Sequence, residues 1–211
     1  IITPAEGGDA PTASEPGLTL KEALRGRHFW ILAISFFLIA FALTAPTPNL
    51  ENILKTLGFS LSEVGAIAAS FGLAVIAGRI VGGWLLDRFY APACAVAVLV
   101  IPAFGCWLLS GTQLSGDMAT VAVLALGFGA GFEFDLLAFL IAKYFGQRSY
   151  GVIYGCFYTV IALGGGLGPV VYGYMFDSLG SYSHALTMGS ISVMIGAMCL
   201  LLLGKYPKLS S

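Results

Sequence analysis

The sequence predicts an all-α integral membrane protein in which six transmembrane helices form two inverted repeats of three. Three observations support this fold class. Hydrophobic residues make up 58% of the 211 residues, charged residues 10%, and the mean hydropathy is +0.90, whereas a soluble domain carries about 25% charged residues. Six long apolar segments follow one another, and a glycine–aspartate pattern occurs twice. The composition excludes a soluble globular domain.

Each apolar segment is long enough to cross a bilayer as a helix. About 20 helical residues span ~30 Å of hydrocarbon, whereas a membrane barrel would show alternating segments of roughly ten residues. We expect helices near residues 29–46, 62–86, 91–111, 118–142, 150–176 and 185–204. They would form one domain over residues 21–211, after a cytoplasmic linker over residues 1–20 rich in Pro, Gly and Ala. A linker at the beginning of the chain suggests that a further segment precedes it in the native protein.

The basic residues orient the helices. With the N-terminus in the cytoplasm, the outer loops carry one basic residue, Lys55. The cytoplasmic side then carries nine, namely Lys21, Arg25, Arg27, Arg79, Arg88, Lys143, Arg148, Lys205 and Lys208. This asymmetry follows the positive-inside rule, although Arg79 lies within a helix. Both ends of the segment are therefore expected in the cytoplasm.

A glycine–aspartate pattern recurs three helices apart. GRIVGGWLLDRF ends the second expected helix, and GPVVYGYMFDS ends the fifth. Both contain Gly, four residues, Gly, three residues and Asp, at Gly78, Gly83 and Asp87 and at Gly168, Gly173 and Asp177. An odd number of helices between the copies is what an inverted repeat requires. Chance is the competing explanation, because Gly and Asp are frequent at helix ends.

Three ionisable residues lie deep in the expected bundle: Arg79, Glu133 and Asp135. Arg79 and Asp135 each stand eight residues before the charged end of their helix, or ~12 Å at a rise of 1.5 Å per residue. Such residues usually face the bundle interior and pair. Glu133 and Asp135 point about 200° apart, so only one can face Arg79, and the sequence does not decide which. The other carboxyl would favour its protonated form. Either could couple a proton to an anion, or serve only as an ion pair for packing or as a latch.

GRIVGGWLLDRF resembles the G-x-x-x-D-R loop motif of the major facilitator superfamily, with matches at Gly83, Asp87 and Arg88. LTLKEALRGRHFW, residues 18–30, resembles the basic segment that leads into the second half of that family. GAGFEFDLLAFLIAKYFG, residues 129–146, resembles the fourth helix of that half in bacterial members related to monocarboxylate and oxalate–formate transporters. The resemblance covers nearly the whole chain. It implies the C-terminal half of a twelve-helix transporter in a bacterial inner membrane, with an N-terminal six-helix half as its partner.

The resemblance also implies roles for single residues. Arg79 would bind a substrate carboxylate, as the Arg in this helix does in monocarboxylate transporters. The animal transporters carry an Asp four residues before that Arg, where this chain has Val75. The motif residues would form a cytoplasmic gate: Gly83, Asp87 and Arg88.

Aromatic residues of the fifth helix are further candidates for the substrate site. Tyr154, Phe157 and Tyr158 lie near mid-helix and could line a cavity with Arg79. Contacts with lipid or with neighbouring helices are the alternative.

Together these features predict a secondary active transporter of a small organic anion resembling a monocarboxylate, driven by protons through alternating access. A transporter of a neutral or cationic solute, as in drug or metabolite efflux, is one alternative. A six-helix assembly module without transport is another. We do not expect an enzyme, since His28 and His184 lie at opposite faces and no HExxH motif occurs. No cofactor, metal site or nucleic-acid partner is expected, and the partners would be substrate, proton and lipid bilayer.

Overall fold

The structure, a computed structural model, describes residues 16–207. Its elements are α1 (Leu20–Arg25), α2 (Arg27–Thr44), α3 (Pro46–Thr56), α4 (Leu61–Arg88), α5 (Ala91–Leu109), α6 (Gly116–Phe145), α7 (Tyr150–Leu179), α8 (Ser183–Leu200) and a 3₁₀ turn, Leu201–Leu203. In this part of the chain six spans are long and apolar enough to cross a membrane, with α2 and α3 counted together as one. The expected six-helix fold is confirmed. Most of the expected linker lies outside the described residues.

The first membrane helix is longer than expected. We placed its end at Pro46, but after Ala45 the chain continues as α3. Pro46 occupies the first turn of α3, where the missing N–H costs little because first-turn N–H groups have no helical partner. The short helix α1 was also not expected. It begins at a capping box in which the Thr19 and Glu22 side chains each bind the other's backbone N–H.

Side-chain caps and glycines set the bounds of the long helices. Ser60 and Glu63 form a capping box at the start of α4, and the Ser115 hydroxyl accepts the Met118 N–H at the start of α6. α6 and α7 end at glycines with positive φ, at residues 146 and 180. Glycine adopts this conformation without the steric cost of a Cβ.

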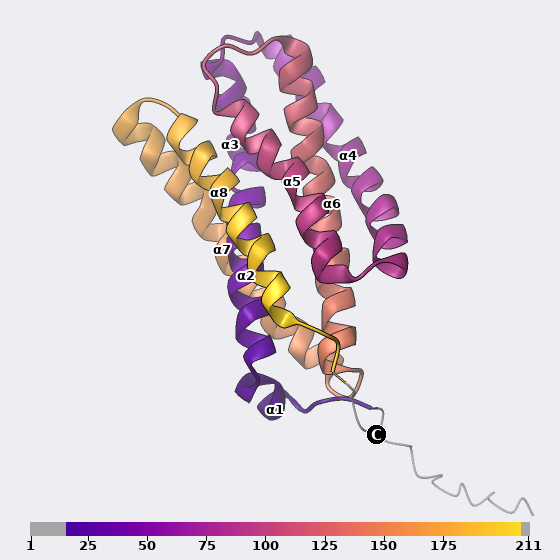
Figure 1. Cartoon of the computed structure of the whole chain (residues 1–211). Helices are drawn as coiled ribbons and strands as arrows, with labels where there is room; N and C mark the ends of the chain where they lie inside the picture. Colours follow the sequence, from indigo (N-terminus) through magenta and orange to yellow (C-terminus); the bar gives the residue numbers. More distant parts are fainter. Residues whose placement is uncertain (1–15, 208–211) are drawn as a thin grey trace, which may run out of the picture.

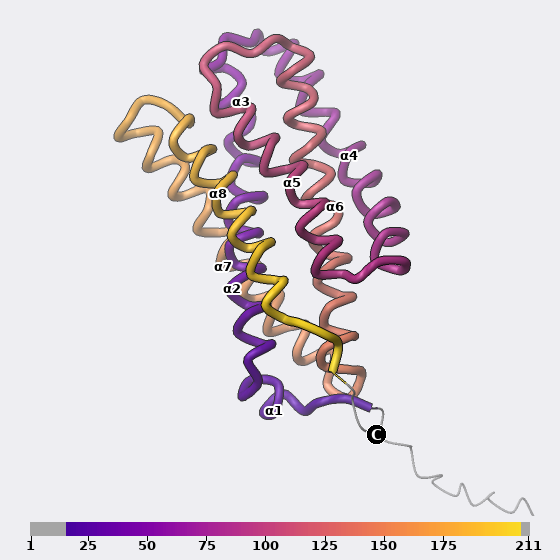
Figure 2. Tube along the Cα trace, in the orientation of Figure 1, coloured from indigo at the N-terminus to yellow at the C-terminus, as the bar shows by residue number. Residues whose placement is uncertain are grey.

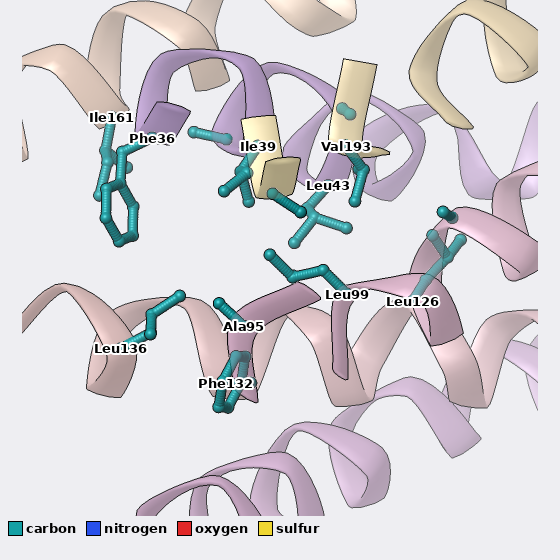
Figure 3. Close-up of a cluster of buried hydrophobic side chains, with 14 of the residues drawn as sticks. Phe36, Ile39, Leu43, Ala95, Leu99, Leu126, Phe132, Leu136, Ile161 and Val193 are labelled. Atoms are coloured by element: carbon teal, nitrogen blue, oxygen red, sulfur yellow. The ribbon is translucent and has the colours of Figure 1, made fainter. Parts of the chain in front are cut away.

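The six membrane helices form one bundle with α2 and α6 at its centre (Figure 1). α4 packs along α6 at one edge, α7 packs along α2 at the other, and α5 and α8 cover one face and contact each other (Figures 1 and 2). Figure 3 shows core side chains from five of these helices: Phe36, Ile39, Leu43, Ala95, Leu99, Leu126, Phe132, Leu136, Ile161 and Val193. Only 22% of the apolar window of α4 and 28% of that of α7 are buried, against 61% for α6. α4 and α7 are therefore the least covered membrane helices of this bundle.

We call one end of the bundle the basic end, because Arg25, Arg88, Lys143 and Arg148 lie there at helix ends and turns. The chain that precedes α1 is fastened to this end. The Leu18 N–H donates to the Phe145 carbonyl at 2.8 Å, and the Gln147 N–H donates to the Pro16 carbonyl at 3.1 Å. This short antiparallel pairing joins residues 16–18 to the α6–α7 turn.

Close glycine contacts show the inverted repeat directly. Gly78 of α4 lies so close to α6 that a Cβ there would overlap the Phe128 carbonyl oxygen. Gly168 of α7 meets α2 in the same way, and its Cβ would lie 2.5 Å from the Phe41 oxygen. Gly78 and Gly168 are the glycines that begin the two copies of the sequence pattern. The second helix of each repeat thus packs on the first helix of the other repeat: α4 packs on α6, and α7 packs on α2.

The third helix of each repeat also packs through a glycine, α5 on α6 and α8 on α2. A Cβ at Gly105 of α5 would lie 2.8 Å from the Ala122 oxygen of α6, and a Cβ at Gly196 of α8 would lie 2.8 Å from the Ser35 oxygen of α2. Ser35 and Ala122 each stand six residues before the Phe that contacts the glycine of the second helix. The two halves of the bundle are therefore three-helix repeats with equivalent contacts.

Candidate functional site

α4 and α6 run side by side in the same direction and meet along a line of glycines, which we call the α4–α6 seam. A Cβ at Gly127 would overlap the Phe71 carbonyl oxygen, and one at Gly131 would overlap the Val75 carbonyl oxygen. Small residues allow such an approach in a membrane, where no hydrophobic effect draws helices together. The glycines near the two carboxylates thus set the distance between α4 and α6.

Arg79 and Asp135 occupy the next position along the α4–α6 seam. The two contacts just described are four residues apart on both helices, and four further residues reach Arg79 on α4 and Asp135 on α6. Residues four apart lie on one face of a helix. Arg79 therefore lies on the face of α4 that packs on α6, and Asp135 lies on the face of α6 that packs on α4. The two side chains form no ion pair within 4.0 Å. Arg79 is exposed and Asp135 is partly exposed in this bundle.

Glu133 faces the other side of α6. Its side chain is 3% exposed, and its Oε1 atom has no hydrogen-bond partner. Gly129, one helical turn before it, packs on α5, where its Cβ would lie 2.5 Å from the Pro102 ring. The structure thus answers the question that the sequence left open: Asp135 stands on the Arg79 side, and Glu133 does not.

The aromatic candidates on α7 differ in how deeply they are buried. Phe157 is fully buried and its ring centroid lies 4.7 Å from that of Phe29, so our suggestion that it lines a cavity is wrong: it is a core residue. Tyr158 is exposed and Tyr154 is partly exposed. Both stand on α7, at the opposite edge of the bundle from Arg79 on α4 (Figure 1). Within these six helices the tyrosines and the arginine are not brought together.

An aromatic cluster at the basic end was not expected from the sequence. The Tyr90 and Tyr144 hydroxyls both donate to the Gly204 carbonyl, the second at 2.5 Å, and the Tyr206 hydroxyl accepts the Ala91 N–H at 3.0 Å. Burial raises the pKa of the Tyr206 phenol, so its hydroxyl stays protonated. These bonds fasten the segment after α8 to α5 and α6. No local spacing could reveal them, since the partners come from distant parts of the chain.

Comparison with known proteins identifies the fold. The family model described as Major Facilitator Superfamily matches residues 32–210. The chain belongs to the major facilitator superfamily. Among solved structures, this facilitator chain is similar to the Escherichia coli fucose:proton symporter FucP, with a TM-score of 0.69 at 16% identity. The match covers 88% of this chain and 45% of FucP, and it establishes the common fold.

Several curated members of the superfamily are similar in sequence. The facilitator chain is 26% identical over 172 residues to the methylenomycin A resistance protein of Bacillus subtilis and 29% identical over 168 residues to the probable nitrate/nitrite transporter NarK2 of Mycobacterium tuberculosis. It is 22% identical over 204 residues to monocarboxylate transporter 13 of Bos taurus. The matches cover 81%, 75% and 96% of this chain but 36%, 40% and 48% of the relatives. The chain thus spans less than half the length of these relatives.

The motif expected to form a gate lies at the basic end of α4. Nothing lies within 4 Å of a Cβ built at Gly83, and Asp87 and Arg88 are both exposed. The Arg88 guanidinium lies 4.4 Å from the centroid of the Trp84 ring, a cation–π contact one helical turn back. In this structure Arg88 therefore rests on its own helix, and Asp87 is free to meet another group.

Proposed function

We propose that the facilitator chain is the C-terminal half of a secondary active transporter that moves a small organic anion together with a proton by alternating access. The observation that carries the proposal is the position of Arg79 with Asp135 beside it, on the side of the α4–α6 seam away from the core. An arginine can bind a carboxylate with two parallel hydrogen bonds. Two of the relatives carry names that refer to anions, nitrate/nitrite and monocarboxylate, which supports an anionic substrate.

Asp135 is the proposed proton acceptor. When ionised, it competes with the substrate carboxylate for Arg79, because the positive guanidinium attracts either carboxylate. Protonation removes this competition, so anion and proton bind together. In the animal monocarboxylate transporters that the sequence resembles, the Asp precedes the Arg on the same helix, where this chain has Val75. In this chain the carboxylate comes from another helix instead: Asp135 of α6 lies opposite Arg79 along the α4–α6 seam.

The N-terminal half of the transporter is the proposed partner. It would cover the surfaces that α4 and α7 leave open, and it would enclose a cavity that Arg79 reaches from one edge and Tyr154 and Tyr158 from the other. Asp87 and Arg88 would latch the two halves at the basic end. By the distribution of basic residues this end is cytoplasmic, and the membrane would be a bacterial inner membrane.

A neutral or cationic solute is the second candidate. The partly exposed carboxylate of Asp135 favours it. Asp135 would then contact the solute, and Arg79 would hold Asp135 in place. A six-helix assembly module without transport remains the alternative outside this class.

Replacing Arg79 by Lys in the intact transporter tests the anion site. Lys keeps the positive charge but loses the planar fork that binds a carboxylate. We expect the apparent affinity for a radiolabelled monocarboxylate to fall by at least about tenfold, because a hydrogen bond to a charged group contributes about 1.5–3 kcal/mol. Initial uptake rates in proteoliposomes over a range of substrate concentrations measure this. Arg148→Lys in the exposed α6–α7 turn is the control, and an unchanged affinity in Arg79→Lys would contradict the binding role.

A further inference from the structure

Glu133 is a buried carboxyl for which the proposed mechanism has no use. It is nearly inaccessible and its Oε1 atom lacks a hydrogen-bond partner. α5, which packs on this side of α6, has no charged residue between Ala91 and Leu109. The charged residues at similar depth, Arg79 and Asp135, stand on the other side of α6. An ionised carboxylate in such a place would be strongly destabilising, whereas a neutral acid needs only an acceptor for its hydroxyl.

α5 offers an acceptor of this kind. Pro102 lies inside the helix and has no N–H, so the carbonyl of Val98, four residues earlier, loses its normal helical donor. A buried carbonyl without a donor is itself unfavourable. This side of the bundle thus contains one buried acid that needs an acceptor and one main-chain carbonyl that needs a donor.

The register of α5 and α6 places these two groups opposite each other. The helices are antiparallel, and they touch where Gly105 meets Ala122 and where Gly129 meets Pro102. One helical turn further toward the basic end, α6 reaches Glu133 and α5 reaches Val98. Both residues lie on the contact faces, because each is four residues from a member of the Gly129–Pro102 contact.

We propose that Glu133 is held as a neutral carboxylic acid whose hydroxyl donates a hydrogen bond to the Val98 carbonyl. Glu133 is then a positioning residue and not the proton carrier. It joins α6 to α5 at the level of the charged pair, and so it sets the rotation of α6 that keeps Asp135 on the Arg79 side. The part of this proposal that concerns transport rests on the proposed function, whereas the protonation state of Glu133 does not.

Infrared spectroscopy of the intact protein in lipid tests the protonation state without a transport assay. We expect a carbonyl stretching band of a protonated carboxylic acid at neutral pH that is lost in Glu133→Gln and kept in Asp135→Asn. Pro102→Ala returns an N–H to the Val98 carbonyl, so the Glu133 band should move to the position of an acid without an acceptor. Absence of the band at neutral pH would overturn the proposal, and a band that Pro102→Ala leaves in place would overturn the Val98 partner.

Transport assays separate the two carboxylates. In proteoliposomes we expect Glu133→Gln to accumulate substrate against a proton gradient within about twofold of the wild type, because an amide can make the same hydrogen bond. Asp135→Asn should lose proton-driven accumulation and keep exchange. If Glu133→Gln instead loses accumulation and keeps exchange, Glu133 is the proton carrier and the positioning role is wrong. A wild-type protein without any transport would contradict the proposed function, and the infrared result would still decide the state of Glu133.

Discussion

At the residue scale, glycines allow the close packing of the α4–α6 seam because they have no side chain. Gly78 and Gly72 are both on α4, but a Cβ at Gly78 would overlap the Phe128 oxygen and a Cβ at Gly72 would meet nothing within 4 Å. We expect Gly78→Ala to destabilise the six-helix chain by about 1–3 kcal/mol, the usual cost of overpacking. Gly72→Ala should be neutral or slightly stabilising, because alanine favours the helix.

Thermal unfolding in detergent, followed by circular dichroism, measures both glycine variants. The Gly72→Ala protein is the matched control for the general effect of a methyl group on α4. Equal melting temperatures for the two variants would show that α4 and α6 can separate without cost. The α4–α6 seam would then not be rigid enough to fix the positions of Arg79 and Asp135.

Residue positions in the candidate site were only partly predictable from the sequence. The depth of Arg79, Glu133 and Asp135 follows from counting residues along helices with known ends. Their directions do not, because the rotation of a helix about its axis depends on which neighbours it meets. The glycine contacts show that rotation here: Gly131 packs on α4 one turn before Asp135, and Gly129 packs on α5 one turn before Glu133. The sequence shows where the glycines are, but it does not show which neighbouring helix each glycine contacts.

At the element scale, the sequence predicts the six spans but not what happens at their ends. Hydropathy alone sets the number of spans, and the structure agrees. α3 was not expected after Pro46, although this proline fits the first turn of a helix. The repeat was visible in two short glycine–aspartate patterns. Its equivalent contacts, such as Gly105 with Ala122 and Gly196 with Ser35, join residues too far apart in the chain for a pattern to show.

The bonds at the basic end also act on whole elements, because they fasten the segment after α8 to α5 and α6. Tyr206→Phe removes the acceptor for the buried Ala91 N–H and should lower the free energy of unfolding by about 1–3 kcal/mol, the cost of an unsatisfied buried donor. Thermal unfolding measures the loss. Tyr174→Phe is the control, since this tyrosine on α7 is 73% exposed. Equal stability of the two variants would mean that the C-terminal segment is not fastened by this bond.

At the scale of the whole molecule, the arrangement of the helices suggests an incomplete transport pathway. α5 and α8 cover one face of the core, whereas α4 and α7 leave much of their apolar surface exposed. Arg79 and Tyr158 are both exposed, on opposite edges. A second bundle over the open face would close the space between the two edges, so that residues of both could contact one solute. The proposed N-terminal half would also bury the apolar surfaces of both edge helices.

The mass of the native polypeptide tests this arrangement. The 211-residue chain has a mass of 22.1 kDa, and it spans 36–48% of the three relatives. An immunoblot of native membranes with an antibody against the α6–α7 turn should therefore show one band near twice the mass of this chain. The purified chain itself is the size control. A band at the mass of the chain would contradict a covalent N-terminal half. Any pathway would then have to form between two copies, with Arg79 of one copy facing α7 of the other.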